Sequence, residues 1–210
     1  MGIGFVIIIH FIFLAILSGI VAAISATVTF FITKNKEKRK RRIFLSVFLP
    51  FQFFFTIYIL GIAGSIMVSE IKDVDIGIGD SFYVPINETC EIHMIDIIDN
   101  AYLECNGENI LSSVSSILPT DDKIFGETED GKFFCYQLNN SELREYSDFS
   151  ELTSNENSPD LDLIEIPEYY HNRRNEIAGT VTIMVGIIAL VLTITIMWLT
   201  RKIVLKFGKK

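Results

Sequence analysis

The chain has 210 residues, a mean hydropathy of +0.39, 21% charged residues and a formal net charge of −8. This hydropathy is high for a soluble protein, and the acidic balance argues against a nucleic-acid-binding protein. The charge is also unevenly spread, because residues 69–177 hold 25 of the 26 acidic residues and only six of the 18 basic ones, a net charge of −19. The sequence therefore predicts an acidic domain joined to apolar anchors.

Three apolar stretches, at residues 1–33, 43–68 and 178–200, are long enough to be transmembrane helices. About 20 residues at 1.5 Å per residue cross roughly 30 Å of hydrocarbon. The first stretch carries small residues spaced three and four apart, a pattern that lets another helix approach closely. Such a face also leaves open a homo-oligomer formed through the first span.

The basic residues next to these stretches predict the orientation of the chain. Residues 34–42 and the tail at 201–210 hold 12 of the 18 basic residues. Short basic segments beside spans stay in the cytoplasm, which places the N-terminus and residues 69–177 on the other side. Attraction to anionic lipids is an added effect of about 1 kcal/mol per basic residue. The cytoplasmic signal in the loop consists of Lys34, Lys36, Lys38, Arg39, Lys40, Arg41 and Arg42.

Aromatic residues mark both predicted membrane interfaces. Trp198 lies three residues before the pair Arg201 and Lys202, an aromatic and basic combination typical of the cytoplasmic interface. Tyr169 and Tyr170 are expected to form the matching collar on the outer side. We therefore interpret these five residues as membrane-interface anchors.

Residues 69–152 are predicted to form a small antiparallel β meander, all-β or α+β, with about four to six strands. Asn106-Gly107 and Asp130-Gly131 favour tight hairpin turns. A short helical piece follows, with Asp148 or Ser150 as its N-cap, and residues 153–177 are interpreted as an acidic linker with the outer collar. The predicted strands are residues 81–86, 90–96, 101–105, 110–118, 123–127 and 132–138.

Three segments of this region carry a resemblance to known proteins. Residues 77–86 (GIGDSFYVPI), 130–139 (DGKFFCYQLN) and 145–152 (EYSDFSEL) resemble uncharacterised bacterial membrane-anchored proteins with a small propeller-blade-like β-meander domain. The resemblance implies a bacterial envelope protein. It implies no active-site residue.

The three cysteines, Cys90, Cys105 and Cys135, all fall in the predicted outer domain, where disulfides can form. Cys90 begins one predicted strand and Cys105 ends its antiparallel neighbour, so both lie at the same end of a hairpin. The sequence favours a Cys90–Cys105 disulfide, with three free thiols as the main alternative. An odd count leaves at least one cysteine unpaired.

The sequence contains no phosphate-binding loop, dinucleotide fingerprint, nucleophile elbow or zinc-protease helix. The cysteines lack the spacing of a zinc site, and the acidic pairs do not match a calcium loop, so no metal or cofactor is expected. We interpret the acidic pairs as solvated turns on a surface that could attract a basic partner. His93 is the best candidate for an outer general base if the domain is an enzyme.

These observations favour a non-enzymatic, multi-pass protein of the cell (inner or cytoplasmic) membrane. Its partners are expected to be the lipid bilayer and another envelope or membrane protein, with the acidic domain mediating the contact as an accessory or scaffold subunit, a sensor or a protection protein. The alternative is a small transporter or channel component. Dependence of flux on His10 or Gln52, two polar residues in the spans, would distinguish the two interpretations.

Overall fold

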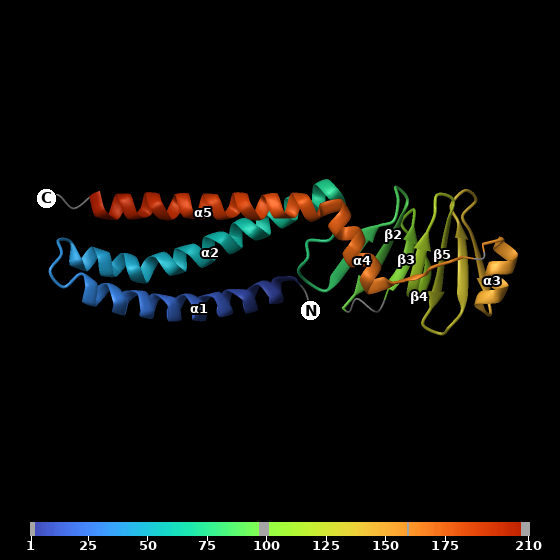
Figure 1. The fold of residues 1–210 in the computed structure, drawn as a ribbon, viewed down its shortest axis with the longest axis horizontal. Coiled ribbons are helices and arrows are strands. Elements are labelled where there is room, and N and C mark those ends of the chain that lie inside the picture. Colours follow the sequence, from blue (N-terminus) through green and yellow to red (C-terminus); the bar gives the residue numbers. More distant parts are fainter. Residues whose placement is uncertain (1–2, 97–100, 159, 207–210) are drawn as a thin grey trace. The chain divides into compact units, whose positions relative to one another are not determined.

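The computed structural model describes residues 3–96, 101–158 and 160–206. The chain divides into two compact units, a helical unit formed by residues 2–67 and 181–210 and a β unit formed by residues 68–180. Figure 1 shows the order of the elements in both units. This division follows the charge, because the helical unit holds 12 basic residues against Glu37 alone, a net charge of +11.

The helical unit is made of α1 (Ile3–Ile32), most of α2 (Arg39–Lys72) and most of α5 (Thr180–Lys206). All three predicted spans are helices that are long and apolar enough to cross a membrane, the third as part of a helical stretch that starts at Ile166. Large apolar side chains on these helices are exposed, up to 72% for Phe31. Helices with apolar surfaces of this extent fit a lipid environment.

Polar side chains within the helical unit join its helices. His10 Nδ1 on α1 lies 2.8 Å from the hydroxyl of Tyr58 on α2. The amide of Gln52 on α2 donates to the hydroxyl of Thr200 on α5 at 2.8 Å. Hydrogen bonds of this kind satisfy polar groups that an apolar environment would otherwise penalise.

The β unit contains eight strands within the described residues, more than the sequence predicts. They form an antiparallel sheet in the order β1 to β7, and β8 pairs with β4. Six of the strands match the predicted ones to within two residues at each end; β7 and β8 were not predicted. The strands are β1 (Ser81–Pro85), β2 (Cys90–Ile95), β3 (Ala101–Cys105), β4 (Glu108–Pro119), β5 (Lys123–Thr128), β6 (Phe133–Gln137), β7 (Glu142–Tyr146) and β8 (Ile164–Glu165).

The predicted hairpin turns are present. Asn106 and Gly107 both have positive φ, 56° and 78°, between β3 and β4, and Gly131 has a φ of 78° between β5 and β6. Asn and Gly adopt this left-handed conformation at the lowest cost, which is why these residues set the turns.

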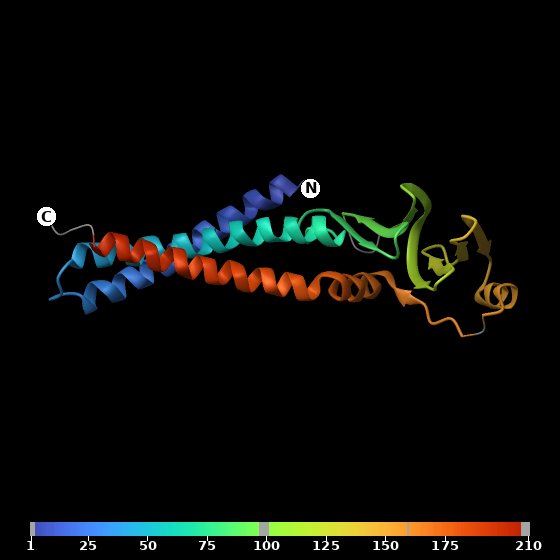
Figure 2. The same ribbon diagram turned by 90° about the horizontal axis from the view of Figure 1, so that it is seen from above.

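Strand β4 divides the sheet into two parts. Its first half pairs with β3 and its second half pairs with β5, with irregular register near Val114 and a positive φ of 58° at Ser113. The bent yellow-green ribbon in Figure 2 is this region. We call β1, β2, β3 and the start of β4 the N-terminal half-sheet, and the end of β4 with β5, β6 and β7 the C-terminal half-sheet.

Two short helices pack on the sheet. Helix α4 (Ile166–Arg174) begins with Pro167 in its first turn and contacts β1, β4 and β8. Helix α3 (Phe149–Glu156) contacts β6 and β7, and its N-cap Asp148 accepts a hydrogen bond from the backbone N–H of Glu151, as one of the two predicted caps should. The end of α3, β8 and α4 lie in the stretch that the sequence assigns to a linker and collar.

Candidate functional site

A surface hollow of the β unit lies beside β4. Two adjoining cavities, of about 480 Å³ and about 290 Å³, share Glu129 in their linings. We call them together the acidic groove. Its carboxylate-bearing residues are Glu127, Glu129, Asp130, Glu145 and Glu165.

The register of three strands explains the carboxylates at one end of the groove. Ser116 on β4 lies opposite Glu127 on β5 and opposite Glu165 on β8. Residues directly opposite on neighbouring strands point to the same face of a sheet, so two carboxylates flank one hydroxyl. The hydroxyl of Ser115 instead donates to the backbone carbonyl of Glu127 at 3.0 Å.

The hydroxyl of Ser116 is the unusual atom in this groove. The residue is only 7% exposed, and its Oγ has no hydrogen-bond partner among the described residues. A buried polar group without a partner costs about 1–3 kcal/mol, so such groups normally have one. The hydroxyl of Ser116 is therefore an unsatisfied buried polar group at the lining of the groove.

The other end of the groove combines charge with apolar surface. Lys132 is its one basic residue and lies 3.2 Å from Asp130, with both side chains exposed. Leu111 and Phe133 supply apolar lining. Carboxylates beside apolar surface suit a Lys or Arg side chain, whose aliphatic stem and charged end need different neighbours.

A second cluster lies on the N-terminal half-sheet and consists of Glu91, His93 and Glu104, which we call the His93 cluster. Glu91 on β2 is paired directly with Glu104 on β3. His93 Nδ1 lies 3.4 Å from Glu91 Oε1 and 3.6 Å from Glu104 Oε2, and the three side chains are 22–27% exposed. The three ligand atoms lie within 4.8 Å of one another, so among the described residues this group could hold a metal ion.

Aromatic rings fix the imidazole of His93. It stacks on Tyr102 of β3 with ring centroids 5.2 Å apart. On the other side, the ring centroid of Tyr83 on β1 lies 5.4 Å from that of His93. Burial raises the pKa of Glu91, His93 opposes this shift, and the nearby Glu104 adds to it. The cluster thus concentrates negative charge in a place where water screens it incompletely.

The cysteines are placed as the sequence favours. Cys90 and Cys105 lie opposite each other on β2 and β3, with sulfur atoms 2.08 Å apart in a disulfide. Cys135 is a buried free thiol. Its burial, with the charge of Glu156 nearby, raises its pKa to about 12, so it lacks the thiolate character that a nucleophile needs.

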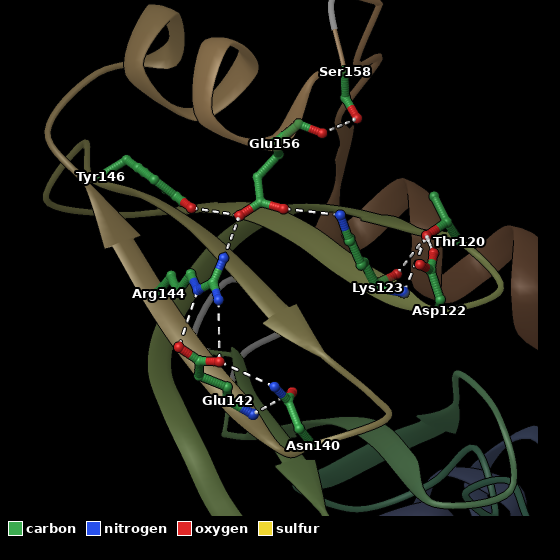
Figure 3. A network of polar contacts seen from close by, with 9 residues as sticks. All are labelled: Thr120, Asp122, Lys123, Asn140, Glu142, Arg144, Tyr146, Glu156 and Ser158. Carbon is green, nitrogen blue, oxygen red and sulfur yellow. Dashed lines mark hydrogen bonds and ion pairs between the residues drawn. The ribbon is translucent and has the colours of Figure 1, made fainter.

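Figure 3 shows a polar network that joins α3 to the C-terminal half-sheet. The carboxylate of Glu156, 3% exposed, accepts hydrogen bonds from Tyr146 at 2.6 Å, from Lys123 at 2.9 Å and from Arg144 at 3.4 Å. Arg144 also binds Glu142 with two nitrogens. The carboxylate of Glu156 is fully engaged by these partners, so we interpret the network as structural.

The two predicted collar tyrosines are buried in the β unit. Tyr169 and Tyr170 are 8% and 4% exposed, and the hydroxyl of Tyr170 donates to the buried Asp75 at 2.6 Å. Arg174 donates to the same carboxylate at 3.2 Å. This network joins α4 to the segment before β1, and the interfacial role of the two tyrosines stays a prediction.

At the other predicted interface, Trp198 is 57% exposed on α5, and the ammonium group of Lys202 lies 4.8 Å from its ring centroid. Arg201 follows on the same helix and is exposed. In the predicted basic segment 34–42, Lys38, which precedes α2, and Arg41, in the first turn of α2, donate to backbone carbonyls near the end of α5. The basic residues of the loop and of α5 therefore gather at one end of the helical unit.

The sequence singles out His93 and the acidic pairs but does not assemble either cluster on the sheet. Glu91 and His93 are two residues apart, and only the strand register brings Glu104 to them. The favoured Cys90–Cys105 pairing was the available signal, because it implies that the neighbours Glu91 and Glu104 are also opposite.

No family model matches this chain, and neither the curated proteins nor the solved structures contain a significant match to it.

Proposed function

We propose that this chain is a non-enzymatic integral membrane protein that crosses the bilayer three times and presents its β unit outside the cytoplasm. In this proposal the acidic groove binds a basic segment of another membrane or envelope protein. The chain thereby serves as an accessory or scaffold subunit of a complex.

The acidic groove is the observation that carries the proposal. Its lining holds Glu127, Glu129 and Glu165, and the first and last of these lie opposite Ser116, whose buried hydroxyl has no hydrogen-bond partner in the part of the chain that the structure describes. The groove belongs to a segment whose net charge is −19. A charge of this size steers a basic partner toward the surface and raises its rate of association. The groove is small compared with a permanent interface, so a reversible contact is expected.

The membrane part of the proposal rests on the charge partition. Residues 34–42 and 201–210 carry 12 basic residues, and both segments adjoin helices able to span a bilayer. The positive-inside rule then favours a cytoplasmic location for both segments. His10 and Gln52, the polar residues that would test the transporter alternative, are already hydrogen-bonded to Tyr58 and Thr200. The Oε1 atom of Gln52 has no hydrogen-bond partner among the described residues, so a flux experiment with variants of His10 and Gln52 still separates the two interpretations.

Orientation can be tested with two epitope tags in intact cells. One tag is inserted after Asn139, in the exposed turn between β6 and β7, and the other follows the C-terminus. We expect an impermeant antibody to bind only the tag at Asn139 until the membrane is opened. Binding to the C-terminal tag alone in intact cells would reverse the proposed orientation.

Binding can be tested by placing a photo-crosslinking amino acid at the exposed Ser112, which lines the groove. We expect a discrete adduct with a second protein, and its loss in the double variant Glu127→Gln, Glu129→Gln. The charge-matched control is Glu88→Gln, Glu108→Gln, two exposed residues outside the groove, which should keep the adduct. Equal loss in both double variants would show a general charge effect and not a groove.

A further inference from the structure

We propose that the His93 cluster binds one divalent transition-metal ion through carboxylate oxygens of Glu91 and Glu104 and through Nδ1 of His93. This inference is independent of the acidic groove and of the proposed partner. It concerns different strands of the sheet, β2 and β3.

The distances within the cluster fit metal coordination better than hydrogen bonding. His93 Nδ1 lies 3.4 Å and 3.6 Å from the two carboxylate oxygens, yet it is a buried atom without a hydrogen-bond partner among the described residues. Zinc holds nitrogen and oxygen ligands at about 2.0–2.2 Å, which in a tetrahedral arrangement separates neighbouring ligand atoms by about 3.4 Å. The two distances from Nδ1 match this separation, and the two carboxylate oxygens, which lie within 4.8 Å of each other, could close on an ion by side-chain rotation.

The surroundings of the cluster hold the ligands in place before an ion arrives. The Cys90–Cys105 disulfide pairs the residues next to Glu91 and Glu104, so it limits how far the two strands can separate. Stacking on Tyr102 restricts the imidazole, and the hydroxyl of Ser81 lies 3.4 Å from its Nε2. Outer contacts of this type orient metal-binding histidines in known sites.

The donor set indicates the class of ion. An imidazole nitrogen with two carboxylates suits zinc, cobalt or a related transition metal, whereas magnesium and calcium prefer oxygen ligands alone. Three protein ligands leave a coordination position for water or for a group from a partner. The two carboxylates supply the negative charge that the ion compensates, within a segment that has 25 acidic residues.

The test uses the full chain in detergent, purified with a histidine-free tag and freed of metal with a chelator. Cobalt is titrated while its visible absorption is recorded, and zinc is then used to displace it. The variants are His93→Gln and Glu104→Gln. Their controls are His171→Gln and Glu108→Gln, which change exposed residues of the same types outside the cluster. Retention of the disulfide and of the circular dichroism spectrum shows that each variant is folded.

We expect one ion per chain in the native protein and in both controls. Affinity should fall at least about tenfold in His93→Gln and in Glu104→Gln. Replacing both disulfide cysteines by serine should weaken binding less than either ligand substitution. Absence of saturable binding by the native chain, or equal loss in variants and controls, would overturn the proposal and leave the cluster as an ion-pair network.

Discussion

The two half-sheets of the β unit are of similar size but are held together by different chemistry. In the N-terminal half-sheet, the Cys90–Cys105 disulfide links β2 and β3 covalently. In the C-terminal half-sheet, the buried carboxylate of Glu156 receives hydrogen bonds from β5 and β7, through Lys123, Arg144 and Tyr146. One connection constrains the unfolded chain, whereas the other depends on ionisation in the folded state.

The two half-sheets should therefore respond to different conditions. Reduction should loosen the first and acid should loosen the second. Hydrogen exchange followed by mass spectrometry can report both responses in one experiment, because peptides from residues 90–105 and 133–156 are separate.

Removing the disulfide should have the largest effect. The double variant Cys90→Ser, Cys105→Ser opens a loop with a sequence separation of 15, for which chain entropy predicts a loss of about 3 kcal/mol. Hydrogen exchange should become faster mainly in residues 90–105. Equal acceleration in residues 133–156 would show that the half-sheets unfold as one unit.

Glu156→Gln should destabilise the C-terminal half-sheet by about 2 kcal/mol. Breaking a buried ion pair costs about 3–5 kcal/mol, but the side chains of Lys123 and Arg144 are 25% and 44% exposed, which reduces the loss. The control is Glu145→Gln, an exposed carboxylate on β7. A comparable loss of protection in the control would contradict a specific role for Glu156.

Tyr146→Phe removes a single hydrogen bond from the same network and should cost about 1 kcal/mol. Glu156 keeps Lys123 and Arg144 as partners in this variant, so the loss should be smaller than in Glu156→Gln. Combining Tyr146→Phe with Glu156→Gln should add little, because both act on one contact. Full additivity of the two effects in unfolding experiments would argue that they are independent.

Acid should produce a smaller difference between the stabilities of the two half-sheets. Burial tends to raise the pKa of Glu156, but hydrogen bonds from Tyr146 and Lys123 lower it below its ordinary value. The stability that its carboxylate contributes is therefore present above the unfolded pKa of about 4.3 and is lost as the pH falls through the folded value. The pKa of Glu91 is raised, mainly by burial, so acid relieves an unfavourable charge in the other half-sheet.

Hydrogen-exchange rates, corrected for the intrinsic effect of pH, should show the different acid responses of the two half-sheets below about pH 5. Residues 133–156 should lose protection relative to residues 90–105. Glu156→Gln should abolish most of the difference, and an unchanged difference in that variant would assign the acid sensitivity to another group.

The sequence predicts the elements whose local chemistry is strong. Buried residues alternate along Cys90–Ile95 and Ala101–Cys105, a pattern that predicts strands from the local sequence. The turn residues Asn106 and Gly107 likewise favour the positive φ that their hairpin needs. Strand β7, Glu142–Tyr146, was missed because charged residues occupy three of its five positions. It is a strand because β6 pairs with it, and tertiary pairing is not visible in local sequence.

The candidate sites were harder to predict for a related reason. Ser116 becomes unusual only when β5 and β8 place Glu127 and Glu165 on either side of it. Glu156 lies in a polar stretch that reads as a linker, and its burial depends on α3 folding against β6 and β7. Sites of this kind depend on strand register and helix docking, which composition does not encode.

The single free thiol gives the protein an intrinsic reporter. With Cys90 and Cys105 joined, Cys135 is the only reduced cysteine in the chain, and it lies fully buried among Phe125, Tyr146 and Leu152. A thiol reagent can reach it only when the C-terminal half-sheet opens, so the labelling rate measures the opening of that half-sheet in the native protein. The chain therefore supports pulse-labelling experiments in cells or vesicles without any engineered probe.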